Sequence, residues 1–344
     1  MTMKYMAGID LHSNNLFCAM VDMDGKRVFE KKLPCQMESV LAALKPFKKR
    51  LEKIAVESTY NWYGLVDGLQ DHGYPVVLAN PAALEQYDGL KQADDKLDGF
   101  FLAEMLRLDI LPTGNICERA VRPVRDLLRR RMGLVHKRAS LILSLKSLHT
   151  RMTGRDLGTG RIKALEPKDA ETLFEHPADQ LITRLDRQLV EQLGQSIKTI
   201  EASILVTVKS LPCYQVLQTM PGVGTILGLT ITLETVDPKR FASPGDYASY
   251  CRCVDSRRMS NGKKKGENNG KCGNKYLAWA FVEAANFAQR HDAACRKFYD
   301  RKKAQVNGIV ATQALACKLA KAAWHRMSQN TDYDAGRMFP GAKK

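Results

Sequence analysis

The sequence lacks a long apolar run and is short of acidic residues. Of its 344 residues, 53 are Lys or Arg and 37 are Asp or Glu, so the formal net charge is +16 at pH 7. No apolar run approaches the roughly 20 residues that a membrane-spanning helix needs. The first ten residues, MTMKYMAGID, lack the apolar region of a signal peptide. We therefore expect a cytoplasmic protein that does not enter a membrane.

The cysteines also lack the pattern of a disulfide framework. Nine of them are scattered along the chain, and in a cytoplasmic protein they indicate reduced thiols. Cys251, Cys253, Cys272 and His291 are a possible zinc site, but their spacing fits no standard pair of Cys-X₂-Cys arms. The simpler alternative is that these cysteines belong to ordinary strands or loops. The basic surplus, in contrast, favours a polyanionic partner, in the first place a nucleic acid.

The first 80 residues predict an α/β domain. Residues 4–33 indicate three antiparallel strands, with Asp24-Gly25 as a hairpin turn between the last two. A helical pattern begins at Met37, and the apolar run KIAVEST (residues 53–59) predicts a fourth strand. A helix and another strand follow over residues 61–80. Three strands followed by alternating helix and strand are typical of an RNase H-like layer of mixed sheet and helices.

Acidic residues stand at the ends of these elements. Asp10 closes the first strand and Glu57 closes the fourth. Asp95 and Asp98 lie three residues apart at the start of a helical pattern and so share one helix face, although Asp94 leaves the register open by one residue. Ligand sites of open α/β sheets form beyond the carboxyl ends of strands, so all four carboxylates can converge. Taken alone, the helical pair has a simpler explanation, because acids at a helix start favour the macrodipole.

A cluster of four carboxylates has a defined chemistry. Neighbouring carboxylates repel one another, and they stay ionised together only if cations lie between them. A set of oxygen ligands suits Mg²⁺ or Mn²⁺, and two such ions about 4 Å apart clamp a phosphate during cleavage. The alternative is a protein that only binds nucleic acid, in which these acids are ordinary ends of strands and helices.

Residues 118–151 are strongly helical and strongly basic, with ten Lys or Arg against two acidic residues. A run of one sign repels itself unless a polyanion compensates it, so we expect contact with an RNA or DNA backbone. A solvated helix face is the simpler alternative. The residues predicted to bind nucleic acid here are Arg122, Arg125, Arg129, Arg130 and Lys137.

Two further segments follow. Residues 179–209 predict a long amphipathic helix, at the lower length limit for a coiled coil, which either contacts another subunit or packs within the chain. Residues 217–231 place Gly222 and Gly224 between two short helices, as in a helix-hairpin-helix. Bare backbone N–H groups at such a turn can hold a phosphate, but the glycines also permit simple packing of the two helices.

Past Phe241 the chain becomes polar, basic and rich in glycine, and we expect a flexible loop. Between residues 256 and 275 there are seven Lys or Arg and one acidic residue. The loop carries Ser260, and a serine in such a loop is no evidence of a nucleophile by itself. Lys263, Lys264 and Lys265 follow the serine, and we expect them to contact nucleic acid.

Short motifs in the first half resemble those of a known family. Gly8-Ile9-Asp10, Val56-Glu57-Ser58-Thr59 and Asp95-Lys96-Leu97-Asp98-Gly99 are similar to the DEDD motifs of RuvC-like transposases of the insertion-sequence one-ten family, whose relatives include the Piv-type DNA invertases. The third family motif typically reads Lys-Thr-Asp-X-X-Asp-Ala, whereas this chain has Ala-Asp-Asp-Lys-Leu-Asp-Gly. The match favours Asp95 over Asp94.

The second half carries the other motifs of the family in the same order. Ser260-Asn261-Gly262 occupies the place of a Ser-Gly motif, and Gly273-Asn274-Lys275-Tyr276-Leu277 that of a Gly-Asn motif ahead of a helix. An asparagine separates the serine from the glycine, Cys272 stands where a basic residue is common, and Ala278 replaces the usual arginine. The resemblance covers residues 5–324 and favours Ser260 over Ser256.

The resemblance implies a DNA transposase or recombinase. Ser260 would attack a phosphodiester to form a serine–DNA phosphoester, assisted by Mg²⁺ or Mn²⁺ at the four carboxylates. The implied partners are target and donor DNA, a structured non-coding RNA called the bridge RNA, and further copies of the chain in a dimer or tetramer. The alternative is a RuvC-like, structure-selective nuclease that uses water in place of the serine.

The resemblance and the patterns together predict four segments. Residues 1–115 form a RuvC-like catalytic domain, and residues 116–210 a basic helix, a linker and a coiled-coil-like helix. Residues 211–330 form a mainly α C-terminal transposase domain with the helix-hairpin-helix and the serine loop. Residues 331–344 form a tail that we expect to be poorly ordered.

Overall fold

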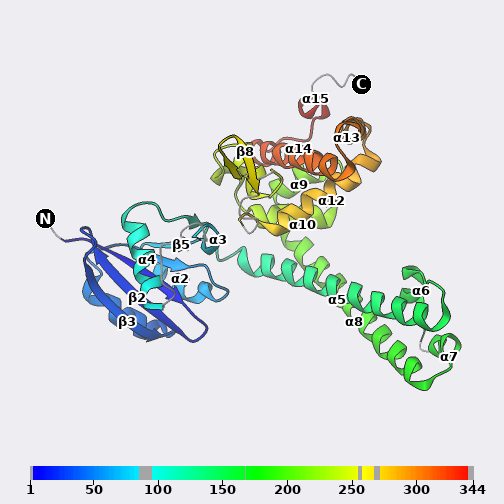
Figure 1. The fold of residues 1–344 in the computed structure, drawn as a ribbon, viewed down its shortest axis with the longest axis horizontal. Helices are drawn as coiled ribbons and strands as arrows, with labels where there is room; N and C mark the ends of the chain where they lie inside the picture. Colours follow the sequence, from blue (N-terminus) through cyan, green and yellow to red (C-terminus); the bar gives the residue numbers. More distant parts are fainter. Residues whose placement is uncertain (1–2, 85–94, 167, 255–257, 267–271, 340–344) are drawn as a thin grey trace. The chain divides into compact units, whose positions relative to one another are not determined.

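The computed structural model describes residues 3–84, 95–166, 168–254, 258–266 and 272–339. The chain divides into two compact units (Figure 1). The first comprises residues 1–117 together with 256–272, and the second comprises residues 118–255 together with 273–344. A mixed α/β sheet makes up most of the first unit, and the second is mainly helical, so the predicted fold classes of the two halves are confirmed.

The first unit is built on a six-stranded sheet in the order β3-β2-β1-β4-β5-β6. The first three strands are antiparallel neighbours, β1, β4 and β5 are parallel, and β6 is antiparallel to β5. Gly25, with a φ of +83°, supplies the left-handed conformation in the turn before β3, as the Asp-Gly pair predicts. The strands are β1 (Tyr5–Leu11), β2 (Asn15–Asp22), β3 (Arg27–Pro34), β4 (Leu51–Glu57), β5 (Val76–Ala79) and β6 (Thr113–Gly114).

Helices cover both faces of this sheet. Helices α1 (Met37–Leu44) and α2 (Trp62–Asp71) share a buried core with one set of alternating strand residues, which includes Ile9 and Val56. Helix α4 (Asp95–Arg107) packs on the other face, where its Phe100 and Ala103 contact β2 and its Leu102 contacts β4 and β5. Because strand side chains alternate between faces, residues one position away from Ile9 and Val56 face α4. The short helix α3 (Pro81–Leu84) follows β5.

Two long helices begin the second unit. Helix α5 (Arg122–Thr153) has Pro123 in its first turn, where the missing N–H costs nothing, and is followed by Gly154 in a left-handed conformation. Helix α8 (Pro177–Val208) packs along it in the antiparallel sense (Figure 1), with Leu128 of α5 against Ile204 and Ile142 against Val190. The two short helices between them are α6 (Thr159–Ala164) and α7 (Asp169–Leu173).

The remaining helices enclose the largest core of the chain. It is rich in alanine and is centred on Phe281 and Leu319, which are fully buried. These helices are α9 (Pro212–Gln218), α10 (Thr225–Thr235), α11 (Pro244–Tyr250), α12 (Lys275–His291), α13 (Ala293–Gln305), α14 (Gly308–Gln329) and α15 (Ala335–Met338). No helix in the described part of the chain is both long enough and apolar enough to cross a membrane.

Two expectations about irregular segments are wrong. Residues 258–266 form a hairpin of β7 (Arg258–Ser260) and β8 (Lys263–Gly266), not a loop without regular structure. Residues 331–339 of the predicted tail include the short helix α15 and pack on the helical unit, where Met338 and Phe339 are buried in the core. In both segments a few residues outweigh a mostly polar composition: Asn261-Gly262 forms the hairpin turn, and Met338 and Phe339 enter the core.

Candidate active site

Asp10 and Glu57 stand side by side at one end of the sheet. Ile9 of β1 pairs with Val56 of the parallel strand β4, so the next residue on each strand lies at the same level. Both side chains project toward the face that α4 covers, since each neighbours a strand residue that faces the opposite core. Asp10 is only 4% exposed, and its Oδ2 lies 3.2 Å from Nε2 of His12. A buried carboxylate of this kind requires a compensating positive charge.

The loops that follow these two strands are tied together. The amide of Asn61 donates to the carbonyl oxygen of His12 over 2.8 Å, and the Thr59 hydroxyl donates to Oδ1 of Asn61 over 2.9 Å. The loop after β4 is thereby joined to the loop after β1. This connection fixes the spacing of Asp10 and Glu57 at the carboxyl ends of their strands.

Helix α4 lies directly on β1, and two glycines make that contact possible. A Cβ on Gly8 would come within 2.1 Å of the carbonyl oxygen of Gly99 and 2.7 Å of the amide of Ala103. A Cβ on Gly99 would meet the Phe17 ring at 3.1 Å and the Cβ of Ala19 at 3.3 Å. Gly99, which stands where the family motif has alanine, therefore packs closely against β2.

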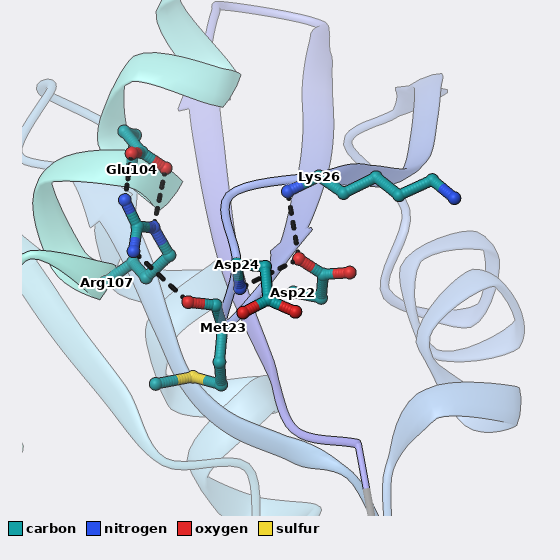
Figure 2. Close-up of polar contacts among 6 residues, drawn as sticks. All are labelled: Asp22, Met23, Asp24, Lys26, Glu104 and Arg107. Atoms are coloured by element: carbon teal, nitrogen blue, oxygen red, sulfur yellow. Dashed lines mark hydrogen bonds and ion pairs between the residues drawn. The ribbon is translucent and has the colours of Figure 1, made fainter.

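The other end of α4 is fastened to the turn between β2 and β3 (Figure 2). Arg107 donates from Nε to Oε2 of Glu104 over 2.9 Å and from Nη1 to the carbonyl oxygen of Met23 over 3.2 Å. The turn is held by Asp22, whose Oδ1 accepts from the backbone amides of Asp24 and Lys26. The hydrogen bond from Arg107 lowers the pKa of Glu104.

These contacts set the direction of α4 relative to β1. Arg107 lies at the level of Asp22, which pairs with Tyr5 at the beginning of β1. Gly99 lies over Gly8, so the first turn of α4 extends toward Asp10. The backbone therefore brings Asp98 and the start of α4 to the same end of the sheet as Asp10 and Glu57. Asp94 and the side chain of Asp95 lie outside the described residues.

No group of three or more His, Cys, Asp or Glu side chains is arranged to hold a metal ion in the part of the chain that the structure describes. Of the cysteines considered for zinc, Cys251 and Cys253 are buried in the helical core. Burial raises the pKa of Cys253 to about 12, so its thiol stays protonated at neutral pH. Cys251 and Cys253 are packed in the hydrophobic core, as the simpler alternative to a zinc site expects.

Ser260 is the last residue of β7, directly before a tight turn. It pairs with Lys263, and the two residues between them, Asn261 and Gly262, have φ angles of +50° and +69°. Positive φ at both central positions is what a two-residue type I′ hairpin turn requires, and Asn-Gly is its preferred pair. The serine is thus presented at the tip of a hairpin. Its side chain, that of Lys264 and the whole of Ser256 lie outside the described residues.

The basic residues predicted on α5 differ in their surroundings. Arg130 and Lys137 are exposed, Arg125 is half-buried, and Arg122 is only 4% exposed. Arg129 forms a two-pronged ion pair with Glu234 of α10, with both N···O distances at 2.7 Å. Its charge is therefore already compensated within the protein, which leaves Arg130 and Lys137 best placed to meet a phosphate.

Glu234 is the centre of a buried polar network. Its side chain is only 1% exposed, and besides Arg129 its Oε2 accepts from the amide of Asn274 over 2.8 Å. Oδ1 of Asn274 accepts from the backbone amides of Tyr276 and Leu277 and so caps α12. Burial lowers the pKa of Arg129, but the hydrogen bonds with Glu234 outweigh it, so the pKa rises above its ordinary value. The basic helix, α10 and the start of α12 are joined through one carboxylate.

The two glycines between α9 and α10 have different surroundings. Gly222 has a φ of +76°, and a Cβ there would come within 2.1 Å of the carbonyl oxygen of Ala284 in α12. Gly222 is therefore required for close packing. Gly224 is the N-cap of α10 and has no atom near the position of a Cβ. Only Gly224 offers an open approach to the helix N-terminus.

Comparison with known proteins finds the same family in both halves of the chain. A family model of DEDD transposases of the IS110 type, described as "Transposase", matches residues 7–152. A second model, described as "Transposase IS116/IS110/IS902 family", matches residues 214–300. The chain belongs to the IS110/IS116 family of DEDD transposases. It is therefore a DNA transposase, an enzyme that cuts and rejoins DNA.

Curated relatives are similar over nearly the full length of this transposase. It is 24% identical over 366 residues to an uncharacterized 44.8 kDa protein of insertion element IS116 from Streptomyces clavuligerus, with 91% of both chains covered. It is 22% identical over 345 residues to the transposase for insertion sequence element IS1328 from Yersinia enterocolitica, with 95% of this chain and 97% of that protein covered.

Sequence reasoning missed two residues of the transposase that the structure makes prominent. Glu234 is the one charged residue in the stretch TILGLTITLET, and a lone acid in such a helix is a signal of a buried partner. Arg107 has no such signal, since a basic residue in the last turn of a helix is common for reasons of the helix dipole.

If Asp98 is a catalytic group, replacing Arg107 with alanine is expected to reduce DNA cleavage roughly 10- to 100-fold, because a catalytic group displaced by about 1 Å loses that much rate. The substitution frees the end of α4 from the turn at Met23 and so loosens the position of Asp98. Arg107→Lys should recover part of the rate, since a lysine still reaches the carbonyl oxygen.

Single-turnover cleavage and DNA affinity of the Arg107 variants are the measurements. The matched control is Lys4→Ala, which breaks the exposed ion pair with Glu52 in the same unit and should leave the rate unchanged. Equal rates for Arg107→Ala and the control would show that α4 does not depend on this contact.

Replacing Glu234 with alanine is expected to lower the free energy of unfolding by about 3 kcal/mol, the lower end for a broken buried ion pair. The lower end applies because the Arg129 side chain is 32% exposed. The double variant Arg129→Met/Glu234→Leu should recover most of the loss, because no buried charge is left alone. Denaturant unfolding of the two variants measures this, with Asp156→Ala of the exposed Lys146 pair as a control that changes little. A loss that the double variant does not recover would contradict the account.

Proposed function

We propose that this transposase cuts and rejoins DNA through a covalent serine–DNA phosphoester on Ser260, assisted by a metal site of Asp10, Glu57, Asp95 and Asp98 on a RuvC-like fold. The observation that carries the proposal is the common level of Asp10 and Glu57 on neighbouring parallel strands, facing the helix that begins at Asp95. The mixed sheet, with three antiparallel strands followed by alternating helix and strand, supports this assignment of the fold.

The residues present fit a divalent metal. Asp10 is a buried carboxylate, Glu57 ends the neighbouring strand, and α4 starts at the same end of the sheet. A ligand set of carboxylate oxygens suits a hard cation, so we propose Mg²⁺, or Mn²⁺ in its place. When bound, the metal supplies charge stabilisation for the phosphate and lowers the cost of deprotonating a hydroxyl.

The proposed chemistry exchanges one phosphoester for another. The Ser260 oxygen attacks the phosphorus, the bond from phosphorus to one deoxyribose oxygen breaks, and that oxygen leaves as a free hydroxyl after taking up a proton. The serine proton passes to a nearby base, because a neutral serine hydroxyl is a weak nucleophile. Rejoining is the same step in reverse, with a DNA hydroxyl as the attacking group, so no external energy source is required.

Three basic or glycine-rich surfaces support the binding of nucleic acid. Arg130 and Lys137 are exposed on α5, Lys263 and Lys265 are exposed on the serine hairpin, and Gly224 opens the N-terminus of α10. We assign the contact at Gly224, in a helix-hairpin-helix, to a DNA backbone phosphate. The long basic helix α5 is the surface that we assign to a structured bridge RNA.

Helix α8 supports an oligomer. Leu181, Leu185 and Leu189 recur at four-residue steps and are 51%, 52% and 46% exposed, although α5 packs against another side of the same helix. An exposed stripe of leucines on a long helix is typical of a surface that meets a second helix. We propose that it joins copies of the chain in a dimer or tetramer. Ser260 and the four carboxylates then act on one phosphate either within a copy or across two copies.

Removal of divalent metal tests the metal site. EDTA is expected to abolish cleavage of a DNA substrate, and added Mg²⁺ or Mn²⁺ should restore it while Ca²⁺ should not, because cleavage needs the tighter octahedral geometry of the smaller ions. DNA binding measured in the same samples serves as the control. Cleavage that persists in EDTA would contradict the proposed role of the carboxylates.

Sequencing the RNA that co-purifies with the transposase tests the guide. A single structured species with segments complementary to target and donor DNA is the expected result, and it should be lost when Arg130 and Lys137 are both replaced with glutamine. Bulk cellular RNA without such a species would contradict the assignment of α5. A protein that releases free DNA ends with turnover, and never a protein-linked end, would favour a nuclease that uses water.

A further inference from the structure

A cleft of about 180 Å³ lies between α14 and the segment that contains α15, in the helical unit. Its wall carries basic residues from both elements, namely Lys318, Lys321, His325, Arg326 and Arg337, and one acidic residue, Asp334. Lys321 and His325 are four residues apart on α14 and so share one helix face. A concentration of one charge in a concave site is unfavourable unless an anion compensates it.

One of the residues that line this cleft is a buried arginine. Arg326 is only 6% exposed, and its Nη1 donates to the hydroxyl of Thr331 over 3.0 Å and to the carbonyl oxygen of Asp332 over 2.8 Å. Its buried Nε has no hydrogen-bond partner among the residues that the structure describes. A buried guanidinium that is bound only to neutral groups has donors and charge left for a ligand.

The other basic side chains that line the cleft differ in their contacts. Lys318 donates to the carbonyl oxygen of Met338 over 3.1 Å and lies against the rings of Phe298 and Phe339, which fixes its ammonium group. Arg337 is exposed and lies 3.7 Å from Asp334, whose other oxygen caps α15. That long, exposed ion pair compensates little of the charge. Lys321 is exposed as well.

We propose that this cleft binds a backbone phosphate of duplex DNA, as a contact separate from α5 and the serine hairpin. The family membership of the chain makes DNA its substrate, and the basic groups here match a phosphate, because most protein–DNA hydrogen bonds go to phosphate oxygens and sugars and these contacts position the protein. The site therefore adds affinity and orientation without reading sequence.

The test measures the affinity of the full-length protein for an arbitrary DNA duplex over about 50–200 mM NaCl. Lys321→Ala/Arg337→Ala is expected to reduce the slope of log affinity against log salt by about 1 to 2, and the affinity roughly tenfold or more. The matched control is Lys49→Ala/Lys53→Ala, which removes the same charge from exposed positions of the first unit and should change neither value.

Lys321→Gln alone should give about half of the slope change, and it keeps the test valid if the double variant folds poorly. Equal slope changes in the test and control variants would overturn the proposal, since they would reflect net charge alone. An unchanged slope in the test variant would also overturn it. A parallel titration with single-stranded RNA distinguishes the source of the phosphate, and a loss confined to RNA would contradict the assignment to DNA.

Discussion

Replacing Asp10 with asparagine is expected to reduce DNA cleavage by about 10²- to 10³-fold or more, the range for removing one group that stabilises transition-state charge. Asparagine keeps the size of the side chain but loses the charge and one of the two oxygen ligands. Because Asp10 is buried beside Glu57 on the neighbouring strand, the loss of charge weakens any cation held at this end of the sheet. The measurement is the single-turnover cleavage rate with saturating protein.

The control for Asp10 is DNA affinity together with the unfolding midpoint. Both should stay close to the values of the unmodified protein, since removing one of several like charges relieves repulsion. Glu57→Gln and Asp98→Asn should likewise lower the cleavage rate and leave the DNA affinity unchanged. If all three variants still cleave DNA at the normal rate, the carboxylates have no catalytic role and only stand at the ends of strands and helices. The catalytic site would then lie elsewhere in the protein.

Replacing Ser260 with alanine is expected to abolish the covalent protein–DNA adduct and to lower strand cleavage by at least about 10³-fold, as for the loss of other serine nucleophiles. The hairpin should survive, because its turn is formed by Asn261 and Gly262, which supply the two positive φ angles. DNA binding should therefore be unchanged. A substrate with a nick close to the cleavage position traps the adduct, which denaturing gel electrophoresis then separates from free protein.

Ser256→Ala is the matched control for this prediction. It removes a hydroxyl from the same basic segment, four positions before the proposed nucleophile. The adduct should persist in this variant. Loss of the adduct in Ser256→Ala with retention in Ser260→Ala would move the nucleophile to Ser256, and an adduct in both would exclude each of them.

The N-terminal fold could be predicted because its signals are local. The Asp24-Gly25 turn and the apolar runs give the meander, and the acids at the ends of strands give Asp10 and Glu57. The seating of α4 could not be predicted, because it depends on contacts between Gly8 and Gly99, which are 91 positions apart. Only the folded chain reveals that these glycines allow the helix to lie on the strand.

The second half was harder to predict for a similar reason. Arg129 reads as one more basic residue of α5, yet Glu234, 105 positions later, neutralises it. The polar, basic composition around Asn261-Gly262 predicts a flexible loop, whereas the pair is a strong hairpin signal and the structure has a hairpin there. Charge patterns predict which segments contact a polyanion, but they do not show which basic side chains are already paired with an acid inside the protein.

Mass spectrometry of the trapped protein–DNA adduct tests the central claim most directly. After nuclease and protease digestion, the account predicts one modified peptide, with a nucleotide phosphate on Ser260, formed only when Mg²⁺ or Mn²⁺ is present and absent from the Asp10→Asn variant. A phosphate on another residue, or complete cleavage with no modified peptide, would contradict it.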